Sequence, residues 1–136
     1  MPTSPPIPKE PPSLKIGFRI EIEKINLKNL FPETDKSSEE LSGILALFIL
    51  GILESLNNGL MSTSDVLETF FHVDNILFVR QHLRDRTADE IMSRGVQLPD
   101  LFDILPAGEA QREFQRELIK MRTLCLALLE GKPMVV

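Results

Sequence analysis

The chain has 136 residues, with 20 acidic and 15 basic side chains and a formal net charge of −5. This length suits one domain with one core, and the acidic balance disfavours non-specific nucleic-acid binding, whose affinity depends on neutralising phosphates. A single cysteine excludes an internal disulfide, and together with the lack of a secretory signal pattern it favours a reducing, cytoplasmic location.

The N-terminal 13 residues are rich in proline. Six of them are prolines, a composition that cannot form a packed core. We therefore expect residues 1–13 to form a disordered, extended tail, and residues 14–136 to form a single helical domain. A polyproline ligand for an adaptor protein is the alternative, but such tails are more often linkers.

Residues 14–22 alternate between apolar and other side chains. The apolar positions are Leu14, Ile16, Phe18, Ile20 and Ile22. This period of two predicts a half-buried β-strand, whose backbone groups need a partner. The candidates are residues 134–136, residues 25–31, or the same strand of a second copy. We predict a homodimer in which 14–22 pairs antiparallel with its copy and Phe18, Ile20 and Ile22 contribute to the interface. A monomer with the strand laid on the helices is the alternative.

The run from Leu41 to Leu53 contains no charged residue. Its 13 residues are too few to span a membrane, which takes about 20, so it predicts a buried core helix. Ser37 and Glu40 match a capping box, and Gly59 suits a C-terminal cap, so the helix should cover 38–58. Because the run is apolar all round, we expect other helices to surround it.

Start and stop signals predict four short helices between this helix and residue 106. Their expected ranges are 63–72, 75–84, 88–94 and 99–105. The expected start signals are Ser62 with Asp65, then Asp74, then Thr87 with Glu90, and finally Pro99. Gly95 is expected to end the third of them.

Residues 108–130 carry the clearest amphipathic pattern in the chain. The apolar positions Ala110, Phe114, Leu118, Met121, Cys125 and Leu128 recur every three or four residues. The fold class predicted from all these elements is mainly α, an irregular multi-helix bundle around the central helix 38–58, with an N-terminal strand at 14–22.

Few residues suggest catalytic chemistry. His72 and His82 are ten positions apart, and zinc needs further ligands that the sequence does not cluster near them. Cys125 lies on the apolar stripe, where a cysteine is usually inert. The acids Glu109, Glu113 and Glu117 each precede a base by three positions, which favours surface ion pairs. We therefore predict no catalytic, cofactor-binding or metal-binding residues, and no enzyme activity.

Three arginines, Arg80, Arg84 and Arg86, form a cluster with three interpretations. In the first, Arg80 and Arg84 lie on the reading helix of a helix-turn-helix within 63–86. In the second, the three arginines pair with the acids of residues 33–74. In the third they belong to a protein interface, where arginine is enriched. The turn lacks a glycine and its first helix is acidic, which disfavours DNA binding.

The run G-I-L-E-S-L-N-N-G-L-M-S-T-S-D-V-L-E-T-F-F, from Gly51 to Phe71, resembles a group of small uncharacterised bacterial helical proteins. The similarity covers about residues 38–130 and implies a helical fold but no activity or functional residues. The expected function is a soluble, non-catalytic protein-interaction module without a cofactor, a membrane segment or an identified partner. A small DNA-binding regulator is the alternative, and an enzyme with an unrecognised site is the third.

Overall fold

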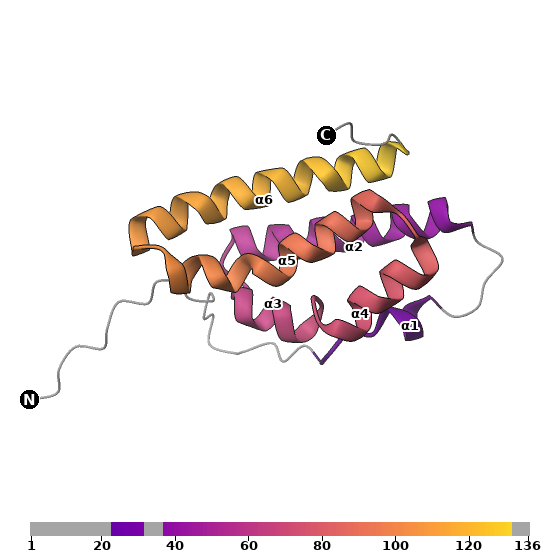
Figure 1. The fold of residues 1–136 in the computed structure, drawn as a ribbon, viewed down its shortest axis with the longest axis horizontal. Coiled ribbons are helices and arrows are strands. Elements are labelled where there is room, and N and C mark those ends of the chain that lie inside the picture. Colours follow the sequence, from indigo (N-terminus) through magenta and orange to yellow (C-terminus); the bar gives the residue numbers. More distant parts are fainter. Residues whose placement is uncertain (1–22, 32–36, 132–136) are drawn as a thin grey trace, which may run out of the picture.

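The computed structural model describes residues 23–31 and 37–131. The predicted tail (1–13) and the predicted strand (14–22) lie outside these ranges. In chain order the elements are α1 (Leu27–Leu30), α2 (Ser38–Asn57), α3 (Thr63–Thr69), α4 (Val73–Phe78), the π-helical turn η1 (Val79–Leu83), α5 (Arg86–Ile104) and α6 (Ala107–Glu130) (Figure 1). Every regular element within the described ranges is helical, which confirms the mainly α prediction.

Helix α2 is the core helix that the apolar run predicts. The Ser37 hydroxyl accepts a hydrogen bond from the Glu40 N–H at 3.3 Å, so the helix begins where its cap was expected. Its buried residues are Ser42, Leu45, Ala46, Ile49, Ile52, Leu53 and Leu56. We expected other helices to surround α2 on all sides. The described helices leave one face uncovered, because the Leu47 side chain is 60% exposed. That face borders the candidate site.

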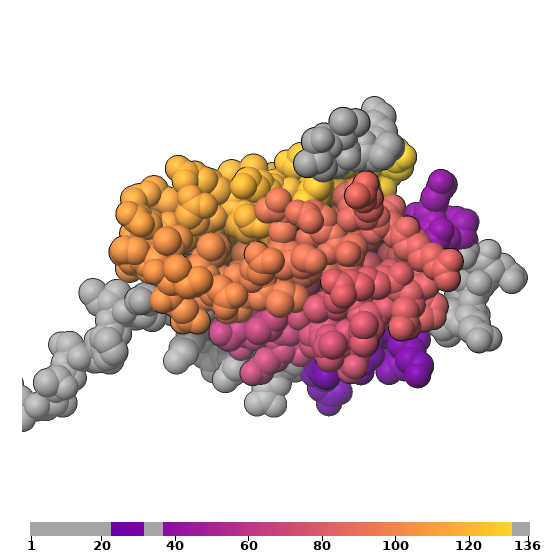
Figure 2. Space-filling view, viewed as in Figure 1, coloured from indigo at the N-terminus to yellow at the C-terminus, as the bar shows by residue number. Residues whose placement is uncertain are grey.

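Helices α5 and α6 form an antiparallel hairpin, and α6 packs along α2 (Figure 1). All six apolar positions predicted for the last helix are buried in α6, which confirms the amphipathic pattern. The Phe114 ring of α6 lies 5.4 Å from the Phe102 ring of α5, measured between centroids. Atoms of α4, α5 and α6 make up most of the face shown in Figure 2. The two predicted helices 88–94 and 99–105 are one continuous helix.

The continuity of α5 has a physical cause. Its buried residues Ala88, Ile91, Met92, Gly95, Leu98 and Phe102 form one stripe without a break in phase. Burying this stripe outweighs the cost of glycine and of Pro99, whose missing N–H removes one hydrogen bond to the Gly95 carbonyl. The start was also predicted wrongly. Asp85, and not Thr87, caps the helix by accepting a hydrogen bond from the Ala88 N–H at 3.0 Å.

The segment between α2 and α5 contains shorter helices than predicted. The capping box of Ser62 and Asp65 is confirmed, with 3.1 Å for both of its hydrogen bonds. Helix α3 nevertheless ends at Thr69 and not at residue 72, because Phe70 and Phe71 turn into the core. The predicted helix 75–84 is instead α4 followed by η1. His72, and not Asp74, is the residue at its N-cap.

Candidate functional site

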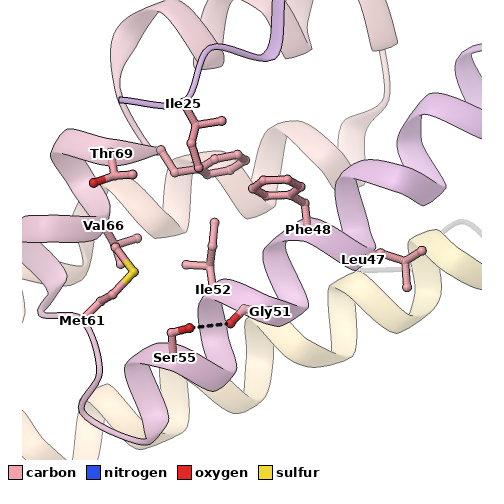
Figure 3. A pocket seen from close by; sticks show the side chains of 10 residues that line it. Ile25, Leu47, Phe48, Gly51, Ile52, Ser55, Met61, Val66 and Thr69 are labelled. Atoms are coloured by element: carbon pink, nitrogen blue, oxygen red, sulfur yellow. Dashed lines mark hydrogen bonds between the residues drawn. The ribbon is translucent and has the colours of Figure 1, made fainter. Parts of the chain in front are cut away.

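An apolar groove runs beside the uncovered face of α2. We call it the α2 groove, and its volume is about 420 Å³. Its described lining residues are Ile25, Leu47, Phe48, Gly51, Ile52, Ser55, Met61, Val66, Thr69 and Phe70 (Figure 3). These ten residues include no charged side chain, no histidine and no cysteine, so the surface is built for apolar contact.

Small residues on α2 form one wall of the groove. Apart from the backbone of its own helix and its chain neighbours, no atom lies within 4 Å of the position that a Cβ on Gly51 would take. The Ser55 hydroxyl donates to the Gly51 carbonyl at 3.0 Å, so its hydrogen-bonding capacity is used inside its own helix (Figure 3). Nearby, the Phe48 ring stacks on the Phe70 ring at 5.6 Å between centroids. The stacked pair joins α2 to the end of α3 and fixes the shape of the groove.

Across the groove, Ile25 is fixed by hydrogen bonds. Its N–H donates to the Thr69 carbonyl at 2.8 Å. Its carbonyl accepts from the Asn75 side-chain amide at 2.9 Å and lies 2.7 Å from Nε2 of His72. The chain that enters the described structure at Glu23 is therefore held against the rim of the groove.

Asn75 organises this attachment. It is 1% exposed, and its Oδ1 accepts a hydrogen bond from the Leu27 N–H at 2.9 Å. Its Nδ2 also donates to the Phe70 carbonyl at 2.7 Å. A buried amide with three partners is satisfied and therefore favourable. The sequence interpretation treated Asn75 only as the start of a helix. The available signal was a polar residue three and four positions before the apolar Phe78 and Val79.

The surroundings of the groove are acidic. Residues 37–74 contain six Asp and Glu residues and no Lys or Arg. Glu54 and Glu68, each next in sequence to a lining residue, are both exposed, whereas the one base in such a position, Lys24, pairs with Asp74 at 3.5 Å. An apolar groove with acidic neighbours favours an apolar segment that also carries basic side chains.

The predicted arginine cluster has a different environment. Arg80 donates to the Asp89 carboxylate of α5 at 2.9 Å, so its partner is not one of the acids in 33–74. Arg84 adopts a left-handed conformation with φ 50° at the end of η1, and its Nε donates to the Gln81 carbonyl at 3.4 Å. Arg86 is the exposed first residue of α5. None of the three arginines lines the α2 groove, and Phe18, Ile20 and Ile22 lie outside the described residues.

The histidines and the cysteine also have structural surroundings. His82 stacks on the Phe78 ring at 4.4 Å between centroids, and its Nδ1 lies 3.2 Å from the Phe78 carbonyl. Burial raises the pKa of the Cys125 thiol to about 12. Within residues 23–31 and 37–131, no three His, Cys, Asp or Glu side chains come together as a metal site would need.

A second groove of about 550 Å³ lies where α5 meets α6. Its lining residues are Leu101, Leu105, Glu109, Arg112, Glu113 and Arg116. Glu113 pairs with Arg116, as the spacing predicted, whereas Glu117 pairs with Arg94 of α5 at 2.8 Å. That hydrogen bond and the charge of Glu117 raise the pKa of Arg94. Glu113 and Arg116 of this groove are thus occupied in an ion pair on the surface.

In the part of the chain that the structure describes, no helix is both long and apolar enough to cross a membrane. A family described as "Protein of unknown function (DUF3969)" matches residues 36–135, which confirms the resemblance to uncharacterised proteins. No curated protein and no solved structure matches the chain. The matched range contains α2 to α6 and every lining residue of the α2 groove except Ile25. The chain therefore belongs to this family of proteins of unknown function.

Proposed function

We propose that this protein is a non-catalytic interaction module that binds an apolar polypeptide segment in the α2 groove. One observation carries the proposal. Leu47 belongs to the most apolar run of the chain, yet it is 60% exposed beside a groove of about 420 Å³. An exposed apolar side chain that borders an uncharged groove extends the apolar surface that a partner could cover. A groove along a helix is also a common way to bind a peptide.

The chemistry of the lining supports binding over catalysis. General acid–base or nucleophilic catalysis needs an ionisable or activated group near the substrate. The two hydroxyl-bearing residues of the lining are Ser55, whose hydroxyl donates to its own helix, and Thr69, which is buried. A ligand would therefore bind in the groove mainly through apolar contacts that fit its shape, and hydrogen bonds would contribute little to the affinity.

The cellular setting is also part of the proposal. The single thiol, Cys125, is free and buried, which agrees with a reducing cytoplasm. A bacterial source follows from the resemblance of the run 51–71. The DNA-binding alternative stays a prediction, and the ion pair between Arg80 and Asp89 engages one of its two reading arginines. The homodimer through 14–22 likewise stays a prediction.

The proposal is tested by selecting binders from a random peptide library displayed on phage, using the full chain as bait. We expect the selected peptides to be rich in apolar residues and to lose at least tenfold in affinity for the Leu47→Glu variant. Ile119→Glu is the matched control, because Ile119 is 64% exposed on α6, outside the groove. Peptides that bind both variants equally, or a selection without binders, would refute the proposed role.

A further inference from the structure

We propose that the α2 groove of the free protein is occupied by residues 14–22 of the same chain, an internal strap that a partner must displace. This inference rests on the proposed function, because it names the resident occupant of the same groove. Four observations support it: the attachment of Ile25, the length of the segment, its pattern and its charge.

The attachment places the segment at the rim. Ile25 lines the groove and is held by the Thr69 carbonyl, the Asn75 amide and the His72 ring. Residue 22 is three positions earlier, a distance of about 10 Å in extended chain. Any extended path from Ile25 towards residue 14 therefore starts beside the groove.

The length of the segment suits the groove. Along α2 the lining residues run from Leu47 to Ser55, which corresponds to about 12 Å of helix. Nine extended residues cover about 30 Å, so 14–22 can cross the whole groove in either direction.

The alternation of apolar residues in 14–22 suits the apolar lining of the α2 groove. Side chains of an extended segment alternate between two faces, so in an extended conformation the five apolar residues of 14–22 would share one face. That side matches a lining without charge. The segment loses exposed apolar area at the same time as Leu47 and Phe48 do, which makes the contact favourable.

The charges on the other face are complementary to the surroundings. Lys15, Arg19 and Glu21 alternate with the apolar residues, and two bases against one acid give 14–22 a net charge of +1, while residues 37–74 contain six acids and no Lys or Arg. The acids next in sequence to lining residues are Glu54, Asp65 and Glu68, against one base, Lys24, and the side chains of Glu54 and Glu68 are exposed. Each exposed pair contributes little by itself, but the sign of the charges favours this segment over an acidic one.

The tether favours the same chain over a second copy. A short linker gives a segment an effective concentration on the order of millimolar at its site. A second copy at micromolar concentration offers the same segment at a concentration about a thousandfold lower. The groove would thus cover, within one chain, the apolar face of 14–22 that the homodimer was predicted to cover.

The test is the labelling rate of a cysteine placed at position 47 of the full chain, with a maleimide reagent. We expect Leu47→Cys to react at least tenfold more slowly than Ile119→Cys, and the double change Phe18→Asp with Ile20→Asp to abolish this difference. Ile7→Asp, which lies in the tail outside 14–22, is the matched control and should leave both rates unchanged. If the double variant is unstable, Phe18→Ser makes the same comparison with a milder change.

Equal rates at position 47 with and without the Phe18 and Ile20 changes would overturn the strap. Protection that disappears on dilution would also overturn it, because the occupant would then be a second copy. The peptide selection separates this inference from the proposed function. Peptides that need Leu47 would uphold the interaction role even if the strap fails. A protected position 47 without any selected peptide would uphold the strap and refute that role.

Discussion

The ring of Phe71 occupies the space that a side chain at Gly95 would need, since a Cβ there would lie 2.4 Å from two ring carbons. Gly95→Ala should therefore lower the free energy of unfolding by about 1–3 kcal/mol, the usual cost of overpacking a core. Urea unfolding followed by circular dichroism measures it. Gly43→Ala is the control in α2, where the new Cβ would meet no atom within 4 Å apart from its chain neighbours and its own helix backbone. The control should be neutral or stabilising by up to about 1 kcal/mol. A neutral Gly95→Ala would show that the contact is not rigid.

Removal of the Asn75 side chain should release the segment that holds Ile25. Asn75→Ala leaves the Leu27 N–H and the Phe70 carbonyl without their partner inside the protein. Each buried group left unpaired costs about 1–3 kcal/mol, so we expect a loss of about 2–5 kcal/mol in urea unfolding. Hydrogen exchange at the Leu27 amide should accelerate as well. Asn57→Ala, at the exposed end of α2, is the control, and equal effects of the two changes would contradict the anchoring role.

The buried stripe of α6 should dominate the stability of the bundle. Phe114 is 2% exposed, and Phe114→Ala should cost about 3–5 kcal/mol as a large core deletion. Ile119→Ala, on the exposed side of the same helix, should change the free energy of unfolding by no more than about 0.5 kcal/mol. A loss below about 1 kcal/mol for Phe114→Ala would mean that this stripe is not core.

Cys125 should be unreactive and should link stability to alkaline pH. Burial raises its pKa from 9.0 to about 12, so the folded protein keeps the thiol protonated where the unfolded chain ionises. The contribution of the neutral Cys125 thiol to the free energy of unfolding is therefore complete below pH 9 and is lost as the pH rises from 9 towards 12. The difference in unfolding free energy between the wild type and Cys125→Ala should narrow between pH 8 and pH 10.5. A constant difference, or rapid thiol labelling of the native protein at pH 8, would contradict this.

Local signals predicted the long helices well. The cap at Ser37, the apolar run of α2 and the stripe of α6 act within a few residues of one another, so one sequence is enough to find them. The helix end predicted at Gly95 is wrong, because the contact that explains this glycine comes from a distant part of the chain. The Phe71 ring, from a residue 24 positions earlier in the chain, packs where a side chain at position 95 would lie. A glycine is therefore needed at this point inside the continuous helix α5. Such long-range contacts cannot be recognised from the neighbouring residues in the sequence.

The candidate site was harder to predict for the same reason. Leu47 was expected to be buried because the run 41–53 is apolar all round, and only the arrangement of the described helices shows that one face is uncovered. Asn75 was read as a helix start, although its partners lie 48 and 50 positions earlier in the chain. Of the predicted interaction residues, the structure describes only the arginines, and none of them lines the groove.

The most direct test of the central claim is photo-crosslinking from position 47 of the full chain with benzoylphenylalanine, mapped by mass spectrometry. The account predicts crosslinks from position 47 to residues 14–22 of the same chain. An excess of a selected peptide should replace them with crosslinks to that peptide. The same group at position 119 should give neither product. If position 47 crosslinks to no polypeptide segment, or no more than position 119 does, the α2 groove is not a polypeptide-binding surface.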